Sequence, residues 1–115
     1  MLSKLHRIPS VRISTVMRTG KRTIDASLQC TVLQTQASDN WRCAVVVPTT
    51  TSKRAVVRNR IKRLISESIA HRNPQLPLGI DLIFFVKKGF NYDSQQQANN
   101  QVQSLLTRAG FSIES

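Results

Sequence analysis

Six basic side chains gather in a short stretch of this 115-residue sequence with no acid among them. They are Lys53, Arg54, Arg58, Arg60, Lys62 and Arg63, and Asn59 lies among them. Ammonium and guanidinium groups bind phosphate oxygens through charge-assisted hydrogen bonds, and here their mutual repulsion is not compensated. The stretch therefore indicates binding of a polyanion. The plain alternative is a solvated surface, but such a surface usually mixes charges, and Glu67 is the only acid between residues 53 and 72.

The whole chain is strongly basic as well. Seventeen Lys and Arg residues stand against six Asp and Glu, which gives a net charge of +11. An excess of this size in a small protein indicates a nucleic-acid partner or, less readily, an anionic membrane surface. An apolar content of 40% argues against disorder, and the length suffices for one hydrophobic core. We therefore expect a single nucleic-acid-binding domain over residues 1–115.

Location and metal content can also be predicted from the sequence. No apolar run approaches the roughly 18 residues of a membrane span, and no signal-peptide core is present. The two cysteines, Cys30 and Cys43, match no metal-ligand spacing and suit a reducing compartment. We expect a cytoplasmic protein that binds no metal or cofactor by itself.

The sequence offers little for catalysis by protein side chains. A nuclease that acts alone needs a general base, a metal site or an activated nucleophile. His6 lies in the basic N-terminal arm and His71 near the end of the basic stretch, and neither has a carboxylate directly beside it. The six acids are scattered, at positions 25, 39, 67, 81, 93 and 114. These residues disfavour a self-sufficient nuclease, although groups remote in sequence can meet in space.

The basic stretch is expected to be one long helix over residues 53–72. A stripe at helical spacing predicts one buried face, and it consists of Val57, Ile61, Leu64, Ile65 and Ser68. Thr51 or Ser52 can cap the first turn, and Asn73-Pro74 closes the helix. The cations then occupy the remaining circumference and face solvent.

The first 24 residues carry six basic side chains and no acid, a composition that a mitochondrial transit peptide would share. A short docked helix explains the pattern better, because Pro9-Ser10 can start it and Gly20 can end it. Between these limits, Ile13, Val16 and Met17 recur at helical spacing. We therefore expect a helix that packs by this face.

The rest of the chain predicts a small sheet. Residues 28–36 begin with alternating polarity and residues 41–47 are nearly all apolar, so we expect a hairpin whose second strand is central. Residues 80–86 form another apolar run, and because a helix separates the two runs they should pair in parallel. Residues 23–26 could add a short strand. A final helix over residues 95–109 should cover the sheet's far side.

A basic helix could also read DNA by entering the major groove. The partner helix and tight turn of that motif are absent from the sequence around residues 53–72. A basic helix held across a sheet instead suits recognition of the shape and backbone of folded RNA.

The segment KRAVVRNRIKR, residues 53–63, resembles the signature of the bacterial ribonuclease P protein subunit, in which a strand like Val45-Val46-Val47 precedes an Arg-Asn-Arg helix. The similarity is strong over residues 42–67. It extends more faintly to the basic N-terminal helix, to the strand that begins at Asp81 and to the C-terminal helix.

The resemblance implies an α+β two-layer sandwich: a mixed sheet of three or four strands, N-terminal, central and C-terminal helices, and a left-handed crossover through the central helix. It also implies an accessory subunit of an endoribonuclease that removes the 5′ leader of precursor tRNA. The RNA subunit and its Mg²⁺ would perform the hydrolysis. The implied partners are ribonuclease P RNA and precursor tRNA, with no membrane and no obligate protein partner.

By the same resemblance, the side chains expected to contact the RNA subunit are Lys53, Arg54, Arg58, Asn59, Arg60, Lys62 and Arg63. A cleft between the sheet and the N-terminal helix is expected to hold the single-stranded leader, and the residues assigned to it are Ile13, Met17, Leu28, Val45 and Val47. The chain departs from the family at Pro48-Thr49-Thr50, where Ser-Lys-Lys is common, and in lacking aromatics at expected leader positions. The alternative is a noncatalytic RNA-structure protein, such as a ribosome-associated basic domain.

Overall fold

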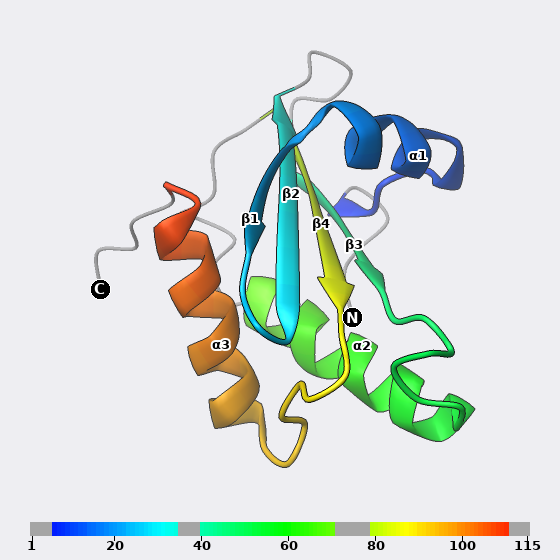
Figure 1. The fold of residues 1–115 in the computed structure, drawn as a ribbon. Coiled ribbons are helices and arrows are strands. Elements are labelled where there is room, and N and C mark those ends of the chain that lie inside the picture. The colour runs from blue at the N-terminus through cyan, green and yellow to red at the C-terminus, as the bar shows by residue number, and fades with distance from the viewer. Residues whose placement is uncertain (1–5, 35–39, 71–78, 111–115) are drawn as a thin grey trace.

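The computed structural model describes residues 6–34, 40–70 and 79–110 (Figure 1). In chain order the elements are α1 (Ser10–Thr19), β1 (Lys21–Ile24), β2 (Leu28–Gln34), β3 (Arg42–Val46), α2 (Ala55–Ala70), β4 (Ile80–Val86) and α3 (Gln95–Arg108). The predicted α+β class, with helices at the start, middle and end of a mixed sheet, is confirmed for the described part of the chain.

The four strands lie in the order β1-β2-β4-β3. β1 and β4 pair antiparallel with β2, whereas β3 pairs parallel with β4, so the predicted parallel pairing is confirmed. The predicted hairpin is wrong, because β4 lies between β2 and β3 and leaves β3 at the edge. The segments that form β3 and β4 are both apolar in sequence, so the sequence did not show which of them is central. In the structure β4 is buried at nearly every position, as a central strand must be.

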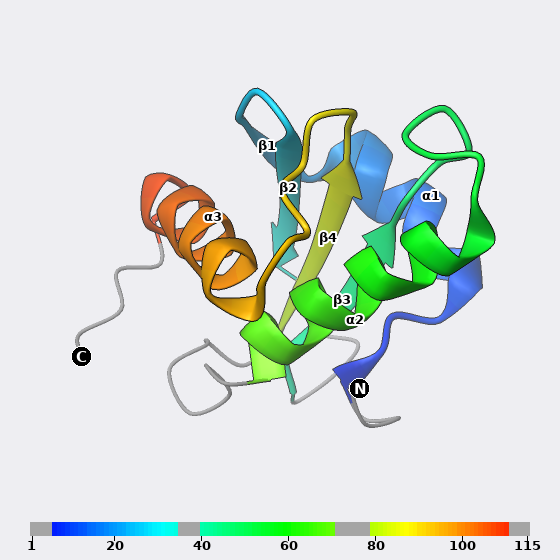
Figure 2. The ribbon, with the colours of Figure 1, turned by 90° about the horizontal axis from the view of Figure 1, so that it is seen from below.

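The helices lie on both faces of the sheet. Figures 1 and 2 show α2 and α3 side by side on one face and α1 on the other. The prediction that the last helix covers the far side is wrong, because α3 packs beside α2. Four strands about 4.8 Å apart make a face too wide for one helix of about 10 Å, so two helices share it. With α2 behind the sheet in Figure 1, the β3–α2–β4 connection is left-handed, as the resemblance implied.

Side chains form a core on each face. The larger core fills the space between the sheet and the α2–α3 layer, and Leu82 and Phe84 of β4 point into it. The smaller core, centred on Ile8, Val16 and Ile83, attaches α1 to the opposite face. Neighbouring strand residues point to opposite faces, so β4 contributes to both cores.

The predicted limits of α1 and α3 are confirmed. α1 follows Pro9 and ends at Gly20, and α3 is capped by Ser94, whose hydroxyl accepts a hydrogen bond from Gln97 N at 3.2 Å. Both helices thus begin and end where their local sequence signals lie.

The predicted start and cap of α2 are wrong. The helix begins at Ala55 rather than Lys53, and the Ser52 hydroxyl accepts from Arg54 N at 3.3 Å, which is before the first helical turn. The first helical hydrogen bonds run from Val57 N and Arg58 N to Arg54 O, at 3.1 Å each, so Arg54 occupies the cap position. The Thr51 hydroxyl instead donates to Val86 O at 2.7 Å, which ties the loop before α2 to the end of β4. The expected end of the helix at residue 72 lies outside the described residues.

Candidate nucleic-acid interface

Helix α2 has one buried and one charged face, as its sequence spacing predicts. The core side buries Ile61, Leu64, Ile65, Ser68 and Ile69, with Val57 packed partly buried beside them. On the other side, the exposed residues of the predicted set are Asn59, Arg60, Lys62 and Arg63, and Arg58 is half-buried. Lys53 and Arg54 are also exposed, but they lie just before the helix begins at Ala55. Burial of the apolar face therefore directs the cations outward.

The ion pairs between described residues use cations outside α2. They join Arg12 and Arg42 to Asp81 and Arg108 to Asp25. Repulsion along the helix is thus not relieved by these pairs. The outer face presents a concentrated positive charge, which suits a phosphate backbone.

Two arginines of the predicted set also donate hydrogen bonds to backbone carbonyls of this chain. Arg58 Nη1 donates to Ser52 O at 2.9 Å, and Arg60 donates through Nε to Tyr92 O at 3.0 Å and through Nη2 to Asp93 O at 3.2 Å. A guanidinium has five N–H donors, so each retains donors for a phosphate. The sequence predicted their charge but not these anchoring bonds, whose partners include residues more than thirty positions away.

Two depressions border the outer face of α2. One, of about 390 Å³, is lined by Asn59, Lys62, Arg63, Ser66 and Glu67. The other, of about 250 Å³, is lined by Arg7, Ile8, Cys43, Ala44, Val45, Lys62 and Ser66. Arg7 was absent from the predicted set and yet shares a surface with Lys62. Its only sequence signal was the basic character of the N-terminal arm.

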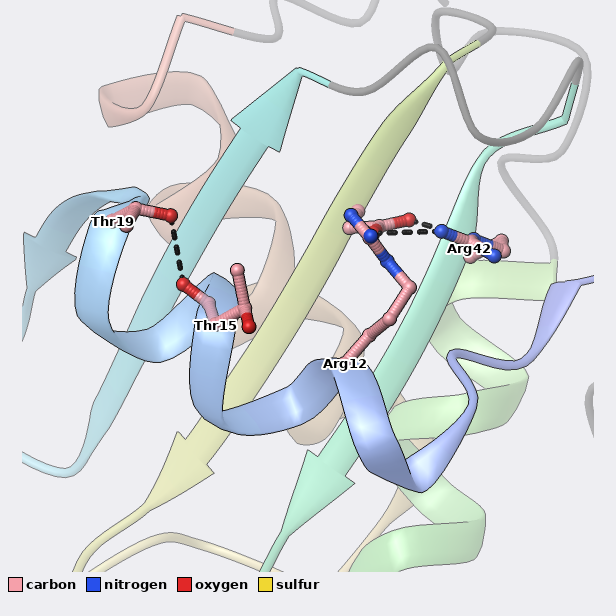
Figure 3. A network of polar contacts seen from close by, with 5 residues as sticks. Arg12, Thr15, Thr19 and Arg42 are labelled. Carbon is pink, nitrogen blue, oxygen red and sulfur yellow. Dashed lines mark hydrogen bonds and ion pairs between the residues drawn. The ribbon is translucent and has the colours of Figure 1, made fainter.

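A carboxylate inside the sheet anchors α1. Asp81 of β4 is fully buried and accepts hydrogen bonds from Arg42 Nε at 2.8 Å and Arg42 Nη2 at 3.0 Å. Arg12 of α1 donates to the same carboxylate through Nε and Nη2, both at 3.3 Å. Figure 3 shows Arg12 reaching over β4 toward Arg42 of β3. One buried charge therefore connects α1, β3 and β4.

The C-terminal end of α1, at Gly20, packs closely against β2. A Cβ on Gly20 would lie 2.6 Å from Thr31 Cγ2 and 2.9 Å from Val32 O, so only glycine fits. Near this end, the Thr19 hydroxyl donates back to Thr15 O at 2.7 Å (Figure 3). Contacts at both ends thus fix the position of α1 over the sheet.

The predicted leader-binding residues do not share one surface. Ile13 and Met17 lie half-buried between α1 and the sheet, in the predicted place. The placement of Leu28, Val45 and Val47 in the same cleft is wrong, because Leu28 and Val47 are buried in the α2–α3 core and Val45 packs against it. The sequence showed which strand residues alternate but not which face meets α1.

Phe85 is an aromatic residue that the predicted site lacked. Phe84 is fully buried toward α2 and α3, and strand alternation turns Phe85 to the α1 face, where it is half-buried. Its neighbours across the sheet are Gln29 of β2 and Val46 of β3. The alternation along residues 80–86 indicates that Phe84 and Phe85 point to opposite faces of the sheet. It does not indicate which of the two faces carries α1.

The described residues offer no evident catalytic group. Burial raises the pKa of the Cys30 thiol to about 12 and that of Cys43 well above its ordinary value, which suppresses the reactive thiolates. His6 stacks on Trp41, with ring centroids 4.0 Å apart, and its Nδ1 donates to Trp41 O at 2.8 Å. In the same part of the chain, no three His, Cys, Asp or Glu side chains lie close enough together to hold a metal ion.

No described helix is both long and apolar enough to cross a bilayer.

The sequence comparisons agree with one another. The family model described as Ribonuclease P matches residues 3–110. A ribonuclease P protein component from Synechocystis sp. is 34% identical over 100 residues, covering 84% of this chain and 78% of the relative. One from Synechococcus elongatus is 30% identical over 113 residues, covering 94% and 93% of the two chains.

Solved structures agree in fold. The ribonuclease P protein of Staphylococcus aureus superposes with a TM-score of 0.83 at 18% identity, covering 95% of this chain and 98% of the other. The protein from Thermotoga maritima gives a TM-score of 0.76 at 20% identity, covering 96% and 99%. At such low identity these similarities establish the shared architecture, including the arrangement of helices and sheet.

Proposed function

The chain belongs to the ribonuclease P protein family, and from that premise we propose that the outer face of α2 binds the catalytic RNA of the enzyme. As a protein component of ribonuclease P it is an accessory subunit of a tRNA-processing ribonuclease and associates with ribonuclease P RNA. The proposal assigns that association to particular residues: Lys53, Arg54, Arg58, Asn59, Arg60, Lys62 and Arg63.

The observation that carries this proposal is the exposed cationic face of α2. Its apolar side is fixed on the core, and the ion pairs between described residues use other cations. A folded RNA supplies the missing negative charge as a rigid array of phosphates. Each phosphate contact releases condensed counterions, so affinity should depend steeply on salt.

The second part of the proposal concerns the 5′ leader of precursor tRNA. We assign it to the face of the sheet that carries α1, where Ile13 and Met17 of that helix lie half-buried and Phe85 of β4 provides an aromatic ring. Stacking of a base on an aromatic side chain is worth about 1 to 3 kcal/mol. The leader would therefore find one stacking partner that the sequence interpretation lacked.

Catalysis is assigned to the RNA subunit and its Mg²⁺, which supplies Lewis-acid and metal-bound-water chemistry when bound. The protein's contribution is to neutralise phosphates and to orient the leader, so it strengthens substrate binding rather than breaking the bond. Because precursor tRNA is made and processed in the bacterial cytoplasm, that compartment is the proposed location.

The test is reconstitution with a bacterial-type ribonuclease P RNA at low Mg²⁺. Added protein should raise cleavage of precursor tRNA, and protein alone should not cleave it. Lys62→Ala with Arg63→Ala should weaken RNA binding. It should also reduce the slope of log affinity against log salt concentration by about 0.9 for each lost phosphate contact. Lys21→Ala with Lys88→Ala removes two exposed charges outside α2 and serves as the matched control. Wild-type salt dependence in the α2 double variant would refute the assignment to α2.

A further inference from the structure

A depression at the outer edge of β3 has features that phosphate binding alone does not explain. Its walls include the buried Ile8 and Cys43 and the half-buried Ala44 and Val45. Two exposed cations, Arg7 and Lys62, stand at its border. It thus combines an apolar interior with a cationic rim.

The depression is formed by segments far apart in sequence. Residues 6–8 run alongside the outer edge of β3, where Arg7 pairs with Cys43 in a parallel bridge and Ile8 N donates to Cys43 O at 3.3 Å. On the other side stands α2, which contributes Lys62 and Ser66. The sheet edge and two backbone segments therefore shape the walls.

The depression continues into the RNA-facing surface of α2. Lys62 and Ser66 also line the larger depression, together with Asn59 and Arg63 of the predicted RNA-binding set. A polynucleotide backbone bound along α2 would therefore pass the mouth of the smaller depression. This continuity, with the charge of its rim, points to RNA as the occupant.

We propose that this depression receives a single unpaired base of the ribonuclease P RNA, while Arg7 and Lys62 bind its flanking phosphates. The inference deepens the proposed function and rests on it. At about 250 Å³ the space is smaller than pockets for drug-sized ligands and matches a fragment such as one base. The base must come from a bulge or single strand, because a base in a duplex costs a few kcal/mol to extrude.

The first test fills the depression without changing charge. Ser66→Leu adds volume at the α2 wall, and leucine is the better helix former. We expect about three- to tenfold weaker binding of ribonuclease P RNA, with an unchanged salt slope because the number of phosphate contacts stays the same. Ser104→Leu makes the same change on the exposed surface of α3 and should bind like wild type. Wild-type affinity in Ser66→Leu would overturn the inference.

The second test needs no ribonuclease P RNA. Titration with adenosine 5′-monophosphate at millimolar concentration, followed by NMR, should shift the signals of Ile8, Ala44 and Val45. Ribose 5-phosphate should shift only those of Arg7 and Lys62. Equal shifts of the apolar residues with both compounds would overturn the base-binding role. If wild-type protein failed to bind the RNA at all, the proposed function would fall, and the nucleotide titration would still decide the chemistry of the depression.

Discussion

Replacing Asp81 with Asn should strongly lower the free energy of unfolding of this protein. Asp81 is fully buried, and its two carboxylate oxygens accept from Arg42 and Arg12. An amide keeps one acceptor oxygen and presents an NH₂ group toward the guanidinium donors. Asn at this position would therefore leave the Arg42 charge, whose side chain is only 10% exposed, without a counterion.

The magnitude follows from the burial. Removing one partner of a buried ion pair costs about 3 to 5 kcal/mol, a large share of the roughly 5 to 15 kcal/mol that stabilises a native protein. At about 4 °C per kcal/mol for a chain of this size, the melting temperature should fall by roughly 12 to 20 °C. Arg12→Met should cost at most about 1 kcal/mol, because Arg12 is 29% exposed and the Arg42–Asp81 pair remains intact.

Urea denaturation followed by circular dichroism measures these differences, and the fluorescence of the buried Trp41 gives an independent probe. The informative control is the double variant Arg42→Met, Asp81→Leu. Replacing both partners by apolar groups of similar size is often neutral, so the double variant should be more stable than Asp81→Asn alone. The reasoning fails if Asp81→Asn lies within about 1 kcal/mol of wild type, or if the double variant is the less stable of the two.

Three further predictions concern single sites. Arg60→Ala should lower the free energy of unfolding by about 1 kcal/mol in urea, because its two bonds to backbone carbonyls are lost, whereas Lys62→Ala should leave it unchanged. Gly20→Ala should cost about 1 to 3 kcal/mol by the same measurement, since the new Cβ would meet a side-chain carbon of β2 at 2.6 Å; an unchanged midpoint would refute this packing argument. Burial raises the pKa of Cys30 from 9.0 to about 12, so the unfolded chain loses this proton first and stability should fall as pH rises above 9. Cys30→Ala should show a shallower fall over that range, and equal slopes in the two proteins would contradict the assignment.

Much of the local structure and the RNA-binding helix could be predicted from the sequence. Helical spacing determines which side of α2 is buried, since residues three or four apart share a face wherever the helix packs. Local stop and start signals likewise place α1 between Pro9 and Gly20 and cap α3 with Ser94. These features depend on neighbours along the chain, so no knowledge of distant contacts was needed.

Only the tertiary structure decided the strand order and the second surface. Alternation divides β2 and β3 into two faces, but which face meets α1 depends on how the strands pair, and so Leu28 and Val47 were assigned to the wrong side. The same pairing brings Arg42 of β3 and Arg12 of α1 to Asp81, and sets Arg7 beside Lys62. Each of these contacts joins residues at least thirty positions apart, because they arise from the closing of the sheet rather than from any periodicity in the chain.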